Sequence, residues 1–372
     1  MADMWPYWFL LLVPLLFASL AGAKALTVLV NQPGTQKLAE RKEAGGIALV
    51  LYAVVLTSLV GWRHEVGGDW LHYLAPLELA LNQSWLEGAM VGGDPAYGLL
   101  TWISAHVGGG VYLVNLVCAA VFVAGLLVFA RHSPQPWLTM CVAVPYLVIV
   151  VAMGYTRQGV AIGLAMIALV ALNNGYLYRF VVWLVFAALF HKSALILVPL
   201  AIFSGRNSWQ AVLGVLLVGA LMFFLLLAEY VDSLIRGYLT AQYESSGAAI
   251  RVAMNAFPAG IFLIFRKRFG LTKSQDAFWT WMSLGAVAFI VLLAISPSST
   301  AVDRVALYWI PLQLFVWSRL PQAMGRQVGS QTQWLAVVLA YSVAVQYVWL
   351  FHADHSWAWI PYKFYPWEWL WG

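Results

Sequence analysis

The ionisable side chains that could do chemistry in this chain stand at the borders of apolar segments. Arg157 lies in the run 154–159, and His191 and Lys192 follow an apolar stretch that ends at Phe190. A cation at membrane depth costs about 2.5–3.5 kcal/mol, so such residues are candidates for a functional site. Several cations together suit a diphosphate, because arginine binds its oxygens bidentately and lysine adds a compact charge. The alternative is that these side chains snorkel to lipid headgroups.

A second group of polar residues begins at Arg63. If a helix starts at Asp69, then Asp69, His72 and Tyr73 share one face, at positions i, i+3 and i+4. A carboxylate beside a histidine at a membrane surface could accept the proton of a hydroxyl group. Asp69 could equally be the N-cap of that helix, and both interpretations stay open.

Two further polar groups lie later in the chain. Asp303 and Arg304 open the apolar segment 305–317, where they form either part of a site or an interfacial cap. Tyr243 and Arg251 flank a run of small polar residues. That run could close over an extended substrate or be an ordinary solvated loop.

The composition defines the class of protein that must position these residues. Of the 372 residues, 63% are hydrophobic and only 9% are charged, with a mean hydropathy of +0.81. These values predict an all-α, polytopic membrane protein with a single transmembrane domain over residues 1–372. Apolar windows indicate about twelve spanning or partly spanning helices, near 7–23, 45–62, 111–130, 137–154, 158–173, 179–190, 193–204, 209–228, 252–265, 276–296, 305–318 and 333–351. The short sixth and seventh windows predict a broken or tilted pair over 179–204, with His191 below the outer surface.

The charge distribution predicts the orientation. With the N-terminus outside, 13 of the 20 Lys and Arg residues fall on the cytoplasmic side, as the positive-inside rule requires. Twelve of the 15 acidic residues and six of the seven histidines then lie outside, which places the groups suited to proton transfer on one face. Longer outer loops would produce part of the same asymmetry. The basic pI reflects anchoring to anionic lipid, so no nucleic-acid partner is expected.

The outer segment 63–108 is the longest between predicted spans, and we expect it to lie at the membrane interface. An amphipathic helix is predicted from Trp70 to Leu86, and a second one from Asp94 to Ala105. Five C-terminal tryptophans favour an interfacial belt over a sugar-stacking surface: Trp357, Trp359, Trp367, Trp369 and Trp371. Cys118 and Cys141 lie in apolar runs, so neither a disulfide nor a thiolate metal site is expected. The sequence has no phosphate-binding glycine loop and no HExxH motif.

Taken together, these motifs resemble the EpsG family of bacterial polysaccharide membrane proteins, which are Wzy-like polymerases. The resemblance covers roughly residues 60–365, with the motifs in the family's order: Arg63, Gly68-Asp69-Trp70 with Tyr73, Asp94-Pro95-Ala96-Tyr97, Arg157-Gln158-Gly159, Phe190-His191-Lys192-Ser193, Tyr238 to Tyr243, Arg304 to Tyr308, and Pro361-Tyr362. Asp94 stands where the family more often has glutamate, which keeps a carboxylate but shortens its reach. The early segment 31–44 carries no mark of the family.

The resemblance implies glycosyl transfer at the periplasmic face of the bacterial inner membrane. The donor would be a glycan on polyprenyl diphosphate, and the acceptor a single lipid-linked repeat unit. Joined to the residues above, it implies Asp69 or His191 as the base, and Arg157, Arg304 and Lys192 as a diphosphate clamp, with Arg63 next. The remaining expected contacts to substrate are Tyr73, Asp94, Tyr97, Tyr243, Arg251 and Tyr308.

No cofactor or metal is expected, since arginines can take the place of a divalent ion at the diphosphate. A chain-length regulator and a flippase are possible partners beside the bilayer itself. Two rival functions remain: a flippase or transporter of lipid-linked sugars, which the lack of an internal repeat disfavours, and a ligase or single-sugar transferase that uses a polyprenyl-linked donor.

Overall fold

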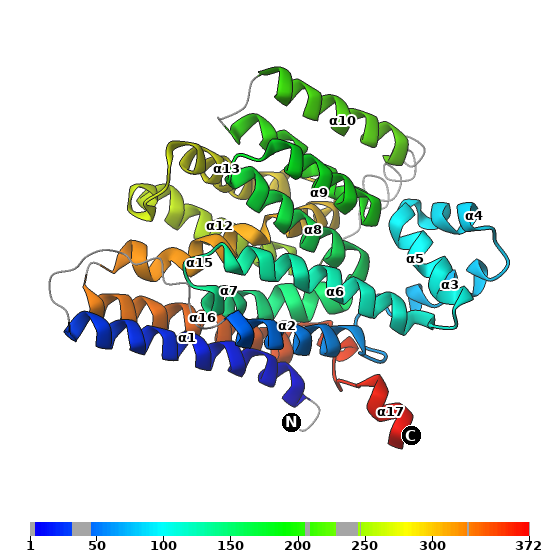
Figure 1. The fold of residues 1–372 in the computed structure, drawn as a ribbon, viewed down its shortest axis with the longest axis horizontal. Helices are drawn as coiled ribbons and strands as arrows, with labels where there is room; N and C mark the ends of the chain where they lie inside the picture. Colours follow the sequence, from blue (N-terminus) through cyan, green and yellow to red (C-terminus); the bar gives the residue numbers. More distant parts are fainter. Residues whose placement is uncertain are drawn as a thin grey trace.

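The helices of the protein run side by side for most of its length (Figure 1). The structure is a computed structural model and describes residues 4–31, 46–204, 209–227, 245, 247–325 and 327–371. The first part of the bundle contains α1 (Trp5–Asn31), α2 (Gly46–Gly61), α6 (Gly110–Arg131), α7 (Pro136–Ala143), the π-helical η4 (Val144–Ala152), α8 (Thr156–Asn173) and α9 (Leu177–Phe190).

The second part of the bundle begins with a 3-10 helix. It contains η5 (Lys192–Ser204), α10 (Trp209–Leu227), α12 (Ala248–Phe265), η8 (Arg266–Phe269), α13 (Lys273–Ile295), α14 (Ser299–Ala306), η9 (Leu307–Trp309), α15 (Ile310–Met324) and α16 (Val328–His352). The chain ends in η10 (Ser356–Ala358) and α17 (Tyr365–Trp371).

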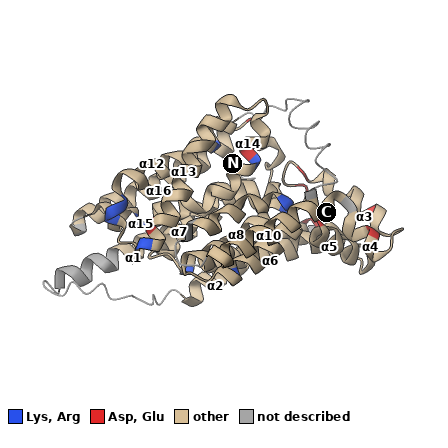
Figure 2. Ribbon diagram, turned by 90° about the horizontal axis from the view of Figure 1, so that it is seen from above, with Lys and Arg blue, Asp and Glu red and all other residues tan. Residues whose placement is uncertain are grey.

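All twelve predicted spans overlap helical segments of this structure. Among the described residues, seven helices are long and apolar enough to cross a membrane: Trp5–Gly22, Gly110–Arg131, Thr156–Asn173, Trp209–Leu226, Ala248–Phe269, Lys273–Ile295 and Gly329–His352. Four more are apolar but shorter: Gly46–Gly61, Pro136–Ala152, Leu177–Phe190 and Lys192–Ile202. Figure 2 shows few charged residues along the helices. The chain is an all-α, multi-pass membrane protein, as the composition predicts; the count of twelve crossings and the orientation stay predictions.

The predicted broken pair over 179–204 is confirmed. Helix α9 ends at Phe190, His191 is extended (φ −158°, ψ 111°), and η5 then continues as a 3-10 helix. An extended residue between two helical segments cannot keep the i→i−4 hydrogen-bond pattern of an α-helix. The side chain of His191 therefore sits at a break in the backbone, at the end of α9.

Glycines bring α6 and α8 into close contact. A Cβ atom added at Gly163 would lie 2.6 Å from the Cα atom of Phe122, and one at Gly125 would lie 2.0 Å from the carbonyl oxygen of Gly163. Since real Cβ atoms do not approach so closely, only glycine allows this backbone contact. It fixes α8, whose first turn carries Arg157, against α6.

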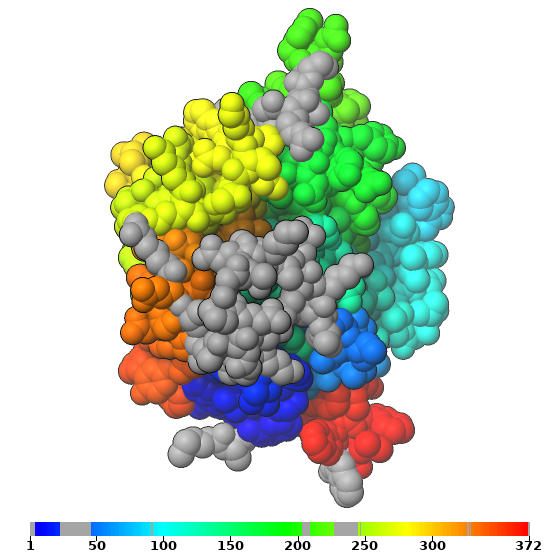
Figure 3. Space-filling model, turned by 60° about the vertical axis from the view of Figure 1, so that its left-hand side comes forward, coloured from blue at the N-terminus to red at the C-terminus, as the bar shows by residue number. Residues whose placement is uncertain are grey.

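Residues 63–108 form a separate small lobe at one end of the bundle, which we call the lobe. It contains η2 (Leu71–Tyr73), α3 (Ala75–Ala80), α4 (Trp85–Met90), η3 (Val91–Gly93) and α5 (Pro95–His106). The lobe lies at the end of the helices near α17 (Figure 1) and bulges from one side of the molecule (Figure 3). Helix α5 packs against α6 and α9. This end of the bundle is called the lobe end below.

The single helix predicted from Trp70 to Leu86 is wrong, because the segment divides into η2, α3 and α4. Ser84 starts α4 anew: the Glu87 carboxylate accepts from the Ser84 amide at 2.8 Å, and the Ser84 hydroxyl accepts from the Glu87 amide at 3.4 Å. This reciprocal pair is a capping box, which marks the start of a helix. The second predicted helix is confirmed as α5.

The C-terminal segment closes over the loop between η4 and α8. The indole of Trp359 is buried and donates to the carbonyl oxygen of Ile149 at 2.7 Å, while Tyr7 donates to the carbonyl oxygen of Trp359 at 2.5 Å. A Cβ atom at Gly154 would lie 2.3 Å from this indole. Trp359 is thus a packing residue and no part of an interfacial belt. Cys118 and Cys141 are buried free thiols, so the expectation of no disulfide is confirmed.

Candidate active site at the lobe end

Asp94 joins three segments that are distant in sequence. One of its carboxylate oxygens, Oδ2, lies 3.0 Å from Nη1 of Arg157 and 3.5 Å from Nδ1 of His191. The other, Oδ1, accepts from the backbone amide of Lys192 at 3.3 Å. We call these four residues the first cluster. It brings together four residues that the sequence analysis selected from separate motifs.

The local backbone explains how Asp94 reaches Arg157. Asp94 occupies the N-cap position of α5, but its side chain makes no capping hydrogen bond. The preceding residues Gly92 and Gly93 have positive φ values of 74° and 70°, which side chains larger than hydrogen rarely adopt. A Cβ atom at Gly92 would lie 3.7 Å from Nη1 of Arg157. The two glycines therefore turn the chain so that the carboxylate faces Arg157.

The first cluster pairs a buried carboxylate with a partly exposed guanidinium. The Asp94 side chain is only 2% exposed, whereas that of Arg157 is 37% exposed. Burial alone would raise the pKa of Asp94, but the nearby groups of His191, Arg157 and Lys192 outweigh it and hold that pKa below its usual value. Asp94 is thus an anion that orients the groups around it. The ring of Tyr97 lies beneath the guanidinium of Arg157, 5.8 Å from its Cζ atom.

Arg63 lies behind the first cluster and is buried, with 1% of its surface exposed. Its guanidinium donates to Asn115 Oδ1 at 3.2 Å and Thr156 Oγ1 at 2.7 Å, and to two backbone carbonyl oxygens, of Val60 and Val66. These bonds hold the first residue of α8, next to Arg157. Arg63 therefore acts as a positioning residue in this arrangement, and its donors point into the protein.

Asp69 and Tyr73 are connected to the same network. The hydroxyl of Tyr73 accepts from the Thr156 amide at 3.1 Å and lies 3.4 Å from Oδ2 of Asp69. Asp69 and Tyr73 therefore lie on the same side although no helix begins at Asp69, whereas His72 is exposed. Burial raises the pKa of Tyr73, and the charge of Asp69 adds to that rise, so the phenol stays neutral. Asp69 itself is partly exposed.

A second group of charges lies in the first turn of α12 and in the second half of α14. Arg251 binds Asp303 through both carboxylate oxygens, with Nε–Oδ1 at 2.5 Å and Nη2–Oδ2 at 2.8 Å. The hydroxyl of Ser245 also donates to Asp303, at 3.2 Å. The N-cap of α14 is Ser298, whose hydroxyl accepts from the Ala301 amide. The interpretation of Asp303 and Arg304 as an interfacial cap is therefore wrong.

Arg304 follows Asp303 directly, and its side chain is exposed. Within the described part of the chain it makes no hydrogen bond or ion pair. Its carbonyl oxygen accepts from Nε2 of Gln158 at 2.6 Å, which ties α14 to the first turn of α8. One turn further on, the hydroxyl of Tyr308 accepts from the Ser193 hydroxyl at 3.1 Å. We call Arg251, Asp303 and Arg304 the second cluster.

Three residues that were not predicted from the sequence also contribute to the candidate site. Asn115 and Thr156 link Arg63 to the start of α8, and Ser245 completes the second cluster. Asn115 could have been found as the one amide in the apolar run 111–130. Tyr243, a predicted contact to substrate, lies outside the described residues.

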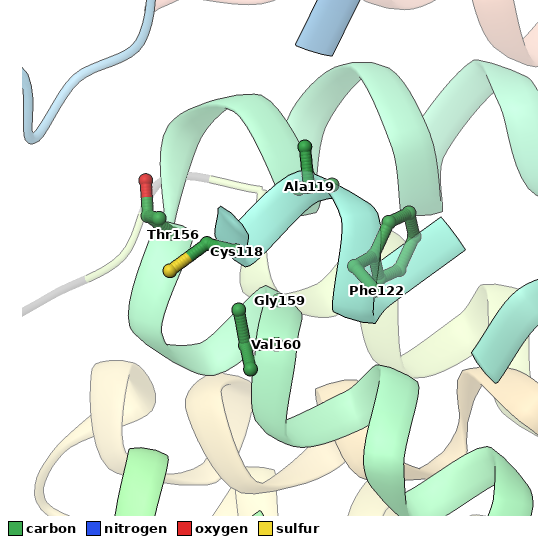
Figure 4. A pocket seen from close by; sticks show the side chains of 7 residues that line it. Cys118, Ala119, Phe122, Thr156, Gly159 and Val160 are labelled. Carbon is green, nitrogen blue, oxygen red and sulfur yellow. The ribbon is translucent and has the colours of Figure 1, made fainter. Parts of the chain in front are cut away.

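A small gap lies between α6 and α8, beside Thr156 (Figure 4). Its walls are mainly apolar, and it is lined by Cys118, Ala119, Phe122, Ala152, Thr156, Gly159 and Val160. The gap is too narrow to hold a water molecule, so it is a packing defect and no substrate site.

The fold and the site define a multi-pass helical membrane protein with a charged cluster at one end of its bundle. The chain belongs to the EpsG family, whose model matches residues 46–364. That match covers most of the chain and suggests a polysaccharide polymerase-like role, with a glycosyltransferase-like reaction. Neither the curated proteins nor the solved structures contain a match.

Proposed function

We propose that this protein polymerises lipid-linked oligosaccharide repeat units at the periplasmic face of the inner membrane. Its donor would be a growing glycan on polyprenyl diphosphate, and its acceptor a repeat unit on a second polyprenyl diphosphate. The first cluster carries the proposal: a partly exposed arginine is held by a buried carboxylate, beside a histidine and a lysine. This combination supplies both the positive charge and the base that such a reaction needs.

Arg157 and Lys192 are assigned to the departing diphosphate. Of the Arg157 donors, only Nη1 is engaged among the described residues, by Asp94. The Nη2 and Nε groups are left to bind phosphate oxygens, and an arginine can offer two parallel hydrogen bonds to them. Charge grows on the diphosphate as its bond to the sugar breaks, so these contacts strengthen in the transition state and accelerate the reaction.

His191 is assigned as the base. Its Nδ1 atom faces the Asp94 carboxylate, which favours a proton on Nδ1 and leaves Nε2 to accept one. The acceptor hydroxyl oxygen attacks the anomeric carbon of the donor, and its proton passes to His191. The bond between that carbon and the diphosphate oxygen breaks, and polyprenyl diphosphate leaves with the bonding electrons. Asp69 is the second candidate base, because it is partly exposed and fixed by Tyr73.

The partners follow from this chemistry. Both substrates are lipid-linked glycans in the bilayer, a flippase would deliver the repeat units, and a chain-length regulator could act on the same product. A flippase breaks no glycosidic bond, so it has no acceptor hydroxyl to deprotonate. The pair of His191 and Asp94 would serve as an oriented base for that step, which supports an enzyme over a flippase.

The experiment is complementation of a strain that lacks this gene. We expect the wild-type chain and the Lys363→Ala variant to restore long-chain polysaccharide, and Arg157→Ala and His191→Ala to leave single repeat units facing the periplasm. Lys363 is a suitable control, since its ammonium is paired with Glu65 at 2.5 Å and belongs to neither cluster. Full restoration by both site variants would overturn the assignment. Repeat units trapped on the cytoplasmic leaflet would indicate a flippase, and products with one added unit a ligase.

A further inference from the structure

The two clusters are built alike. In each, an aspartate binds an arginine from a different helix, and a further cation stands next to one of the members. Asp94 binds Arg157 beside Lys192, and Asp303 binds Arg251 beside Arg304. With one carboxylate and two cations apiece, histidine left aside, each cluster has a formal charge of +1. Each cluster thus offers positive charge to an anion.

The Arg251–Asp303 pair leaves the charge of Arg304 available to an anion. Asp303 is largely buried, and both of its oxygens are taken by Arg251 and Ser245. Arg304, its neighbour in sequence, is therefore not neutralised by Asp303. Its side chain is exposed in the last turn of α14, and an exposed guanidinium can offer two parallel hydrogen bonds to a phosphate.

The clusters are neighbours, because residues next to their members join them. Gln158, adjacent to Arg157, donates to the carbonyl oxygen of Arg304. Ser193, adjacent to Lys192, donates to Tyr308. Tyr155 lies within electrostatic range of charges on both sides of this contact, Asp69 on one and Arg251 and Asp303 on the other. Burial raises the pKa of Tyr155, Arg251 lowers it, and the charges of Asp69 and Asp303 raise it. The backbone segments that carry the two clusters are therefore in contact at the first turn of α8.

A polymerase of the proposed kind binds two diphosphates with different fates. The donor loses its diphosphate, whereas the acceptor keeps its own throughout the reaction. We propose that the first cluster holds the donor diphosphate and that Arg304 of the second cluster holds the acceptor diphosphate. The assignment rests on the proposed function. It divides Arg157, Lys192 and Arg304 between two lipid diphosphates, instead of placing all three around one.

The two arginines should then have different effects. Charge develops on the donor diphosphate only, so the loss of Arg157 lowers kcat. The acceptor diphosphate has the same charge before and during the reaction, so the loss of Arg304 raises the KM for the acceptor and leaves kcat unchanged. If Arg304 had only a structural role, its loss would lower the amount of folded protein, and neither kcat per folded molecule nor the KM for the acceptor would change.

The test is calorimetric titration of the full chain, in lipid nanodiscs, with farnesyl diphosphate; the heat of farnesol is subtracted. We expect two equivalents to bind to the wild type and to Lys363→Ala, and one to Arg157→Ala and to Arg304→Ala. Loss of a charge-assisted contact should weaken the affected site by about 10–100-fold. Arg304→Lys keeps the charge and should retain a weakened second site.

One equivalent in the wild type, or two undiminished equivalents in Arg304→Ala, would overturn the two-site assignment. Neither result concerns whether the protein polymerises, which the complementation experiment decides. Conversely, two equivalents in a protein that makes no polymer would remove the proposed function and leave two diphosphate sites. The two failures are therefore distinguishable.

Discussion

Asp94 occupies the N-cap position of α5, yet its carboxylate lies 3.0 Å from Nη1 of Arg157 instead of capping the helix. An aspartate before a proline would ordinarily satisfy the amides of the first helical turn. Here α5 begins without that cap, and the acid holds a guanidinium from α8. A helix that forgoes its cap for an ion pair indicates that the pair has a role at the site.

Asp94→Asn should abolish polymer formation, because an amide cannot hold Arg157 and His191 by charge. Misplacement of a catalytic group by about 1 Å costs roughly 100-fold in rate, so we expect a loss of at least that size. Asp94→Glu keeps the carboxylate with a longer reach and should retain part of the activity. Gel analysis of polysaccharide length, normalised to the amount of membrane-inserted protein, measures both. Equal activity of the wild type and the Asp94→Asn variant would contradict the role given to the pair.

The ion pair of Asp94 should set no pH limit on the site near neutrality. The pKa of Asp94 is lowered in the folded protein, so its stabilising ion pair is present above its unfolded value of about 3.9 and is lost only as the pH falls through the lower folded value. Between pH 5 and 8 the pair should stay intact.

His191→Gln should lower polymerase activity by about 10²–10⁴-fold, because a glutamine cannot take the proton of the acceptor hydroxyl. The measurement is the initial rate in membrane vesicles at neutral pH. If His191→Gln keeps the wild-type rate and Asp69→Asn loses it, then Asp69 is the base.

Burial of Arg63 predicts that its replacement harms folding more than chemistry. Arg63→Ala removes four buried hydrogen bonds, two of them to the side chains of Asn115 and Thr156. Each buried polar group left unsatisfied costs about 1–3 kcal/mol, so the loss of stability should exceed about 3 kcal/mol. The melting temperature of the purified protein measures it. Arg304→Ala is the matched control, since that side chain is exposed and should melt like the wild type.

The sequence allowed the helices to be predicted well, because in a bilayer every apolar run must satisfy its own backbone as a helix. The lobe was less predictable: the capping box at Ser84 divides a stretch whose hydrophobic pattern favours one helix. Trp359 also escaped prediction, since nothing in its neighbourhood tells a buried tryptophan from one at the interface.

The candidate site was likewise predictable only in part. Arg157, His191 and Lys192 were found because charge between apolar runs is rare. Their contact with Asp94 could not be derived, because no periodicity connects residues so far apart in the chain. Local pattern also left open a cap at Asp303, which in fact pairs with Arg251. Pairings between distant segments depend on how the helices pack, and helix packing cannot be derived from the sequence of any single segment.

The glycine contact between α6 and α8 yields a prediction for stability. A methyl group at Gly163 would lie within 2.6 Å of the Phe122 Cα atom and could be accommodated only if the helices moved apart. Such overpacking costs about 1–3 kcal/mol, and it would also shift the turn that carries Arg157. We expect Gly163→Ala to melt at a lower temperature and to lose activity. Gly214→Ala, on α10, is the control: a Cβ atom there meets nothing within 4 Å, and alanine favours a helix by about 1 kcal/mol. It should be neutral or slightly stabilising, and equal melting temperatures for the two variants would show that α6 and α8 are not held as closely as described.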